Sequence, residues 1–407
     1  MVKNIKSNIF LLSIGILDLI RISANMGNTS SFFSVLFFIV VYACIIFLIH
    51  SFFHSNKEDL KYSTKLYYNA FVIWLTFQLF RSLFNINDYY DWKFLFGTSI
   101  PFTFICLAFY LGFNLKSSQL ILNKNINIIY PFALLTYFLL NQINSETYHR
   151  IVISISFFFP LTLLWPKKRI ILVITMLVAV LSDITFRTGV LKALLTISIM
   201  IPFIVFNKIP KRLILICHKI LFLIPFVFLY LGYTSTFNIF KDFNSSGEKI
   251  EIGNTDSAVS DLAADTRTFI YQETLSSLNS LDDLLFGKGA VGKYKSFHFY
   301  NTGGAIKGMR YGSEVGILNS LLRYGVIGVL LYFLLLYNIT KSAITNSNNK
   351  FIIILSLIIS SRWPLSFIEE FTQFDTNFFF FWFFLGLISN ELLINSSDKK
   401  ISHILKI

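Results

Sequence analysis

The chain has 407 residues, of which 55% are hydrophobic and only 14% are charged. Soluble domains carry roughly a quarter charged residues, so this composition excludes an ordinary soluble protein. The formal net charge of +13 does not indicate a nucleic-acid-binding protein, because the basic residues are dispersed among short loops and form no nucleic-acid-binding motif.

Apolar runs recur along the chain at the length that crosses a bilayer core of roughly 30 Å. They predict an all-α, polytopic integral membrane protein with about 12 transmembrane helices. The first run resembles a signal peptide, but Asp18 and Arg21 within it favour an uncleaved span. The expected spans are residues 8–26, 32–53, 67–84, 92–113, 126–141, 151–166, 170–184, 188–206, 213–233, 314–338, 351–368 and 376–394.

These spans divide the chain into three predicted parts. Residues 1–233 form an N-terminal bundle of about nine helices, and residues 314–407 hold about three C-terminal helices and a tail. Residues 234–313 are the one long polar interval and form a large external loop, in which 261–278 has the pattern of an amphipathic helix. Two glycine-rich pieces that read as turns follow at 287–293 and 301–308.

The distribution of basic residues sets the expected orientation. With the N-terminus inside, the inner segments are basic, as at Lys57, Lys61 and Lys65, at Lys167, Lys168 and Arg169, and at Lys399 and Lys400. The short outer segments are sparse in lysine, and some of them, such as 85–91 and 367–375, are acidic. The positive-inside rule therefore predicts that both termini are cytoplasmic and that the long loop lies outside.

Arg187 and Arg267 are candidate binding groups for an anion. Arg187 lies in SDITFRTG at the outer end of the seventh span, and Arg267 lies in DTRTFIYQE on the predicted loop helix. The planar guanidinium suits bidentate binding of phosphate oxygens. Simpler roles are open, because Arg187 can reach the lipid headgroups and either arginine can pair with a nearby acid: Asp183, Asp265 or Glu273.

Arg310 and Glu314 flank the point where the chain re-enters apolar sequence, in GMRYGSEVGIL. Glu314 is the candidate general base, although the helix dipole also explains a carboxylate in the first turn of the tenth span. His298 is the fallback base. Arg323 lies two to three turns into that span, where an arginine costs roughly 2.5–3.5 kcal/mol and should face protein or a water-filled cavity.

Other polar residues within or near the spans are less specific. Gln78, Arg81 and Lys192 raise the same expectation as Arg323, and outer-half cations without compensating acids indicate an anionic ligand that arrives from outside. The last outer segment holds carboxylates that fit either a metal-dependent transferase or a solvated loop: Glu369, Glu370 and Asp375. The sequence has no P-loop, zinc spacing or GxSxG motif, and we expect neither a metal nor a cofactor.

Short motifs follow one another in a characteristic order. SDITFRTG precedes a single large loop with DTRTFIYQE and LLFGKGA, and SEVGILNSLLRYGVIG follows the loop. The two glycine motifs LFGKG and LRYGVIG are the most specific part. In these motifs, over about residues 170–335, and in its topology, the chain resembles the O-antigen polymerase and O-antigen ligase superfamily.

The resemblance implies metal-independent, inverting transfer of a glycan from an undecaprenyl-diphosphate carrier at the outer face of the bacterial inner membrane. Polymerases pass the growing chain to a lipid-linked repeat unit, and ligases pass it to the lipid A core. It implies that Arg187 and Arg267 hold the diphosphate. The residues themselves, and not the resemblance, make Arg310, Arg323 and His298 further candidate groups that bind substrate. Lipid-linked oligosaccharides and the bilayer are the expected partners, and a chain-length regulator is a candidate protein partner.

One departure from the family pattern distinguishes its two branches. Ligases place a histidine where the span after the loop begins, but Ser313 and Glu314 occupy that place here. A repeat-unit polymerase for O-antigen or capsule is therefore the leading interpretation, and a ligase is one alternative. A lipid-linked oligosaccharide flippase or other transporter is the alternative from another class, against which the long external loop and the absence of a visible repeat argue.

Overall fold

The computed structural model describes residues 31–55, 60–137, 152–182, 187–206, 209–233, 268–297, 308–368 and 374–405. The helices are α2 (Ser31–Phe53), α3 (Tyr62–Leu83), α4 (Tyr89–Phe94), η1 (Leu95–Ser99), α5 (Ile100–Ile105), α6 (Ala108–Phe113), α7 (Leu115–Lys124), η2 (Asn125–Ile129), α8 (Tyr130–Leu135), α11 (Ile155–Phe158), η3 (Phe159–Leu163), η4 (Pro166–Lys168), α12 (Arg169–Leu181), α13 (Arg187–Val205), α14 (Lys211–Tyr233), α16 (Thr268–Ser276), α17 (Leu281–Phe286), α18 (Gly316–Asn346), α19 (Lys350–Ser360), α20 (Arg362–Leu365), α21 (Thr376–Leu387), α22 (Glu391–Ile394) and α23 (Asp398–Leu405). The strands β1 (Tyr294–Lys295) and β2 (Met309–Arg310) pair antiparallel.

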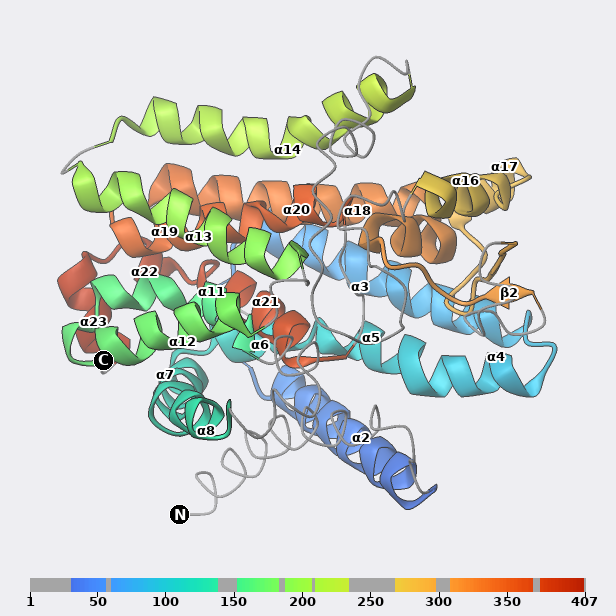
Figure 1. Ribbon diagram of the computed structural model, residues 1–407, viewed down its shortest axis with the longest axis horizontal. Coiled ribbons are helices and arrows are strands. Elements are labelled where there is room, and N and C mark those ends of the chain that lie inside the picture. The colour runs from blue at the N-terminus through green and yellow to red at the C-terminus, as the bar shows by residue number, and fades with distance from the viewer. Residues whose placement is uncertain are drawn as a thin grey trace, which may run out of the picture.

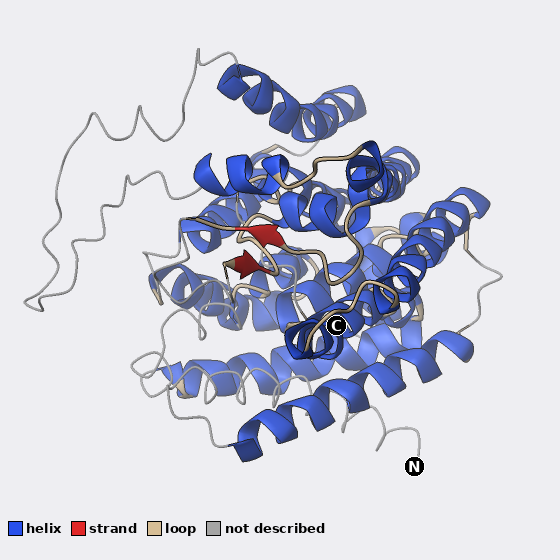
Figure 2. Cartoon of the chain, turned by 90° about the vertical axis from the view of Figure 1, so that its right-hand side faces the viewer, coloured by secondary structure: helices blue, strands red, loops and turns tan. Residues whose placement is uncertain are grey.

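Most of the long helices lie roughly along one direction, whereas α2 crosses it at an angle, so the bundle has two distinct ends (Figure 1). One end carries α16, α17, the two strands and the start of α4, and we call it the hairpin end. The other end carries α22 and α23, and we call it the basic end. Figure 2 looks onto the hairpin end and shows the two strands near the middle of that face.

Within the described residues, four helical stretches are long and apolar enough to cross a membrane: Val35–Phe53, Tyr89–Phe113, Thr188–Val205 and Gly316–Asn346. These stretches confirm the sequence prediction that the protein is mostly helical and has helices of the membrane-spanning type. The count of twelve spans stays a prediction, and the first of them, 8–26, lies outside the described residues. The stretch 316–346 outlasts its predicted end at 338, because backbone hydrogen bonding continues through the polar residues that follow the apolar run.

The core of the bundle is built around α21, in which every residue is buried. Its sequence TNFFFFWFFLGL packs against α6 at very close range. A β-carbon on Gly386 would lie 1.8 Å from the carbonyl oxygen of Phe109, and one on Gly112 would lie 1.7 Å from that of Phe383. Glycine at both positions therefore lets the two backbones touch, as small residues do between membrane helices.

Contacts at the basic end join segments that the charge pattern assigns to the inner side. Lys61 Nζ lies 3.8 Å from Glu391 Oε1, and Lys211 Nζ donates to the carbonyl of Thr345 at 3.0 Å. Lys350 Nζ donates to the carbonyl of Phe203, near the end of α13, at 2.9 Å. The helices α7 and α23 pack against each other. These predicted inner segments thus lie at one end of the bundle, opposite the hairpin.

The described part of the predicted external loop packs directly against the bundle. The helix α17 lies on α18, and α16 contacts both β1 and α18. Tyr271 of α16 donates its hydroxyl hydrogen to the carbonyl of Phe367. Within the predicted amphipathic helix 261–278, residues 261–267 lie outside the described part, and the helix seen there runs over Thr268–Ser276.

Candidate active site at the hairpin end

The last residues of α17 and the segment that follows it, residues 285–293, cross the end of α3, and we call them the strap. Gln78 Nε2 donates to the carbonyl of Phe286 at 2.8 Å. Arg81 NH1 donates to the same oxygen at 3.1 Å and to the carbonyl of Gly287 at 2.7 Å. The expectation that Gln78 and Arg81 face protein is therefore confirmed, and both serve to hold the strap.

The strap also covers a break in α18. Gly325 interrupts this helix with a φ of 66° and a ψ of −175°, which frees carbonyl groups in the preceding turn. The amide of Lys288 donates to the carbonyl of Leu322 at 2.7 Å, and Trp74 Nε1 donates to that of Tyr324 at 3.0 Å. A broken helix inside a membrane protein requires such partners, and here other segments provide them.

The hairpin β1–β2 places Arg310 opposite Tyr294. Arg310 NH1 donates to the Tyr294 hydroxyl at 3.4 Å. Burial raises the pKa of Tyr294, so its hydroxyl stays protonated at neutral pH. Helix α16 supports the hairpin, because the carboxylate of Glu273 accepts from Ser296 Oγ at 2.8 Å and from the amide of Phe297 at 2.9 Å, directly after β1.

Glu314 pairs with Arg310 across a distance of 3.3 Å between Oε1 and NH2. The two side chains are 30% and 17% exposed, so a solute can reach them. We expected Glu314 in the first turn of a helix, but α18 begins two residues later, at Gly316. The reason is local: Ser313 exchanges two hydrogen bonds of 2.7 Å with the side chain of Asn319 and keeps the chain extended before the helix.

Arg323 is buried, with 2% of its surface exposed, which confirms the expectation that it faces protein. Its NH2 donates to the carbonyl of Tyr311 at 3.1 Å, and its guanidinium lies 4.9 Å above the ring of Phe94. Its Nε and NH1 make no hydrogen bond of normal geometry to the described residues, although the Tyr324 hydroxyl lies close enough to interact. As placed, Arg323 fixes the segment between Arg310 and Glu314.

The structure describes only some of the remaining residues that the sequence predicts for the site. Arg267 and His298 lie outside the described residues, and Arg267 directly precedes α16 in the sequence. Arg187 is the first residue of α13, and its side chain is likewise not described. Lys192, on the same helix, is buried. Their roles in binding stay predictions.

Of the three carboxylates in the last predicted outer segment, only Asp375 lies within the described residues. Glu369 and Glu370 lie outside the described residues. Asp375 Oδ1 accepts from the amide of Phe378 at 2.8 Å and caps the start of α21. A helix cap, which is a common use of aspartate, therefore explains Asp375.

The sequence does not predict the contacts of two polar groups, Asp91 and Arg362. Asp91 Oδ1 accepts from Lys293 Nζ and from the Tyr311 hydroxyl, each at 2.8 Å, across 202 and 220 residues of sequence. Nothing local marks such a contact, since 85–91 reads simply as an acidic loop. Arg362 is buried against Asn377, at 2.9 Å, and its charge inside the predicted span 351–368 was the signal that could have found it.

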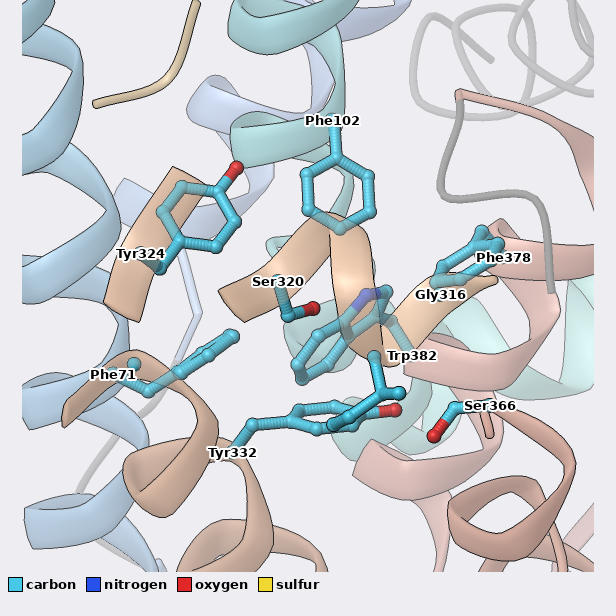
Figure 3. A pocket seen from close by; sticks show the side chains of 11 residues that line it. Phe71, Phe102, Gly316, Ser320, Tyr324, Tyr332, Ser366, Phe378 and Trp382 are labelled. Atoms are coloured by element: carbon cyan, nitrogen blue, oxygen red, sulfur yellow. The ribbon is translucent and has the colours of Figure 1, made fainter. Parts of the chain in front are cut away.

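A small cavity lies inside the bundle next to the first turns of α18 (Figure 3). Aromatic side chains line most of it, among them Phe71, Phe102 and Trp382, and Ser320 faces into it. Its volume of about 30 Å³ is enough for a water molecule but far below that of a sugar ring. A glycan therefore cannot occupy this cavity as it stands, whereas Arg310 and Glu314 at the hairpin end are partly exposed.

The hairpin end thus joins a carboxylate, its paired arginine and a second, buried arginine within residues 310–323. A carboxylate held beside a guanidinium can accept a proton, while nearby cations stabilise a developing negative charge. Comparison of the chain with models of protein families, with curated proteins and with solved structures found no significant match.

Proposed function

We propose that the chain is a membrane glycosyltransferase that polymerises lipid-linked glycan repeat units, for an O-antigen or a capsule. It transfers a glycan from undecaprenyl diphosphate to the next lipid-linked repeat unit, without a metal ion and with inversion at the anomeric carbon. The chain resides in the bacterial inner membrane, with both termini in the cytoplasm and the hairpin end on the outer side. The resemblance carried by the two glycine motifs motivates this choice of reaction.

The observation that carries the proposal is the pair of Arg310 and Glu314 at the end of the bundle opposite the basic segments. Both side chains are partly exposed and lie 3.3 Å apart. The inner-side lysines Lys61, Lys211 and Lys350 make their contacts at the other end. By the positive-inside rule the pair faces outward, where lipid-linked glycans are polymerised.

The chemistry that follows is a single displacement. Glu314 takes the proton from a hydroxyl of the acceptor sugar, and the oxygen attacks the anomeric carbon of the donor. The bond from that carbon to the diphosphate oxygen breaks, and the diphosphate leaves with the electron pair. Arg187 and Arg267 neutralise the charge on the leaving diphosphate, so no acid has to protonate it. Arg310 orients the carboxylate of Glu314.

The test is an assay with purified protein in vesicles and synthetic lipid-linked repeat units. A ladder of products supports the polymerase. Transfer to lipid A core would establish the ligase instead, and movement of the substrate across the bilayer without either product would establish the transporter. Addition of EDTA should leave the ladder unchanged.

Glu314→Gln should lower the rate by about a hundredfold or more, since general-base catalysis contributes 10²–10⁴-fold. Glu391→Gln is the matched control, because Glu391 forms an exposed ion pair at the basic end. Full activity of the Glu314 variant would remove this residue as the base.

Arg267→Ala should abolish the ladder while the protein remains folded in the membrane. The expected loss follows from the charge that the leaving diphosphate develops. Size-exclusion chromatography in detergent reports on folding, and an unchanged ladder would remove Arg267 from the mechanism.

A further inference from the structure

The carboxylate of Asp91 holds groups from two distant parts of the chain. Its Oδ1 accepts from Lys293 Nζ and from the Tyr311 hydroxyl, both at 2.8 Å, and its Oδ2 accepts from the amide of Asn87 at 3.0 Å. Only 1% of the side chain is exposed. Both oxygens are therefore occupied, and the side chain is closed to solvent.

The two side chains that Asp91 holds bracket the hairpin. Lys293 directly precedes β1, and Tyr311 directly follows β2. Between them, Tyr294 and Arg310 lie opposite each other in the strand pair. One carboxylate at the start of α4 thus fastens both ends of the hairpin, through charge-assisted hydrogen bonds of the stronger kind.

Tyr311 is fixed from two more directions. Its ring stacks on Phe94, with 5.0 Å between the centroids, and its carbonyl accepts from Arg323 NH2 at 3.1 Å. The same Phe94 ring lies beneath the guanidinium of Arg323. Since Tyr311 stands next to Arg310 and three positions before Glu314, its side chain and backbone together determine where this ion pair can lie.

We propose that Asp91 is a positioning residue of the candidate site, and that Asp91, Lys293 and Tyr311 form a clamp that sets the geometry of Arg310 and Glu314. Its effect on catalysis rests on the proposed function, whereas its effect on the hairpin does not. The clamp also gives Lys293 a structural role. Asp91 balances the charge of Lys293, so Lys293 does not serve to bind the anionic donor. Asp91 itself is buried and does not contact substrate.

The first measurement is hydrogen exchange, which needs no substrate. Asp91→Asn keeps the size of the side chain but removes its charge, and Tyr311→Phe removes one hydroxyl. Each should speed exchange in peptides covering 294–297 and 308–312 by at least about tenfold, as expected when a local opening becomes easier. Asp282→Asn, an exposed acid on α17, is the control and should change neither peptide. Unchanged exchange in both clamp variants would overturn the clamp, whether or not the wild type polymerises glycans.

The second measurement is the rate of polymerisation. A shift of the reacting groups by about 1 Å can cost 10²-fold, so kcat should fall about tenfold or more in either variant, while KM changes less than about twofold. The double variant should lose little more than Asp91→Asn alone, because both changes release one clamp. Full kcat in the two single variants, or losses that multiply in the double variant, would overturn the positioning role. Absence of a ladder in the wild type would overturn the proposed function and leave the exchange result to decide the clamp.

Discussion

Gly287 and Gly325 pass each other so closely that neither can carry a side chain. A β-carbon on Gly287 would lie 2.6 Å from the amide nitrogen of Gly325, and one on Gly325 would lie 2.5 Å from that of Gly287. Both residues have a positive φ, of 72° and 66°. The two glycine motifs LFGKG and LRYGVIG, separated by the hairpin in sequence, therefore meet where the strap crosses the break in α18.

Replacing either glycine by alanine should destabilise the hairpin end. A residue other than glycine at such φ values costs about 1–3 kcal/mol, and the clash with the opposite backbone adds to it. Thermal unfolding in detergent should show a lower midpoint for Gly287→Ala and for Gly325→Ala. Gly97→Ala is the control, since its new methyl would meet Phe38 at an ordinary 3.5 Å. Equal midpoints for all four proteins would contradict the close crossing.

Removing the charge of Arg310 should separate activity from stability. The ion pair with Glu314 is partly exposed, and such pairs contribute roughly 0–1 kcal/mol, so Arg310→Ala should melt close to the wild type. Its polymerisation rate should nevertheless fall about tenfold or more, because the carboxylate loses its orienting partner. Lys295→Ala serves as the comparison: Lys295 is exposed and pairs with Met309, on the strand face away from Arg310. A rate for Arg310→Ala equal to that of Lys295→Ala would contradict the role of the pair.

The two ends of the bundle should react with reagents from opposite sides of the membrane. Lys295 lies exposed at the hairpin end, and Lys400 lies exposed on α23 at the basic end. In intact cells, a cysteine at position 295 should be labelled by a membrane-impermeant maleimide, and one at position 400 should be labelled only after lysis, as the positive-inside rule requires. The reverse pattern would invert the topology and place the candidate site in the cytoplasm.

Alkaline pH should weaken the attachment of the hairpin through Tyr311. Burial, together with the neighbouring Asp91, raises the pKa of Tyr311 above its ordinary value of 10.0. The folded protein therefore holds this proton more tightly than the unfolded chain, so the stabilisation is complete below about pH 10 and declines as the pH rises beyond it. The melting midpoint of the wild type should fall more steeply between about pH 9 and 11 than that of Tyr311→Phe. Tyr89→Phe, which changes an exposed tyrosine, should follow the wild type.

Much of the helical framework follows from local sequence. The runs at 32–53, 92–113 and 188–206 coincide with helices that can cross a membrane, because apolar composition over about 20 residues is enough to specify such a helix. The glycine motifs could also be recognised from the sequence, although nothing in it indicated that they touch each other. Gln78, Arg81 and Arg323 were expected to face protein because a charged or amide group is costly in lipid.

The partners of these groups were not predictable. Asp91 reads as one more acid in a short loop, and its contacts with Lys293 and Tyr311 span 202 and 220 residues. Glu314 was expected within a helix, but the side chain of Asn319 bonds the backbone of Ser313, keeps the chain there extended and delays the start of α18. Arg362 needed the fold to bring the start of α21 within hydrogen-bonding distance before Asn377 could become its partner.

By itself, the sequence determined that the chain forms apolar helices, that its basic segments alternate with segments sparse in lysine, and that one polar interval contains paired glycine motifs. Only the tertiary structure decided that the strap crosses the break in α18 and that Asp91 fastens the hairpin. The physical reason is that helix formation and partition into lipid depend on the composition of neighbouring residues. Hydrogen bonds between side chains hundreds of residues apart depend instead on how the finished helices pack, which no local pattern records.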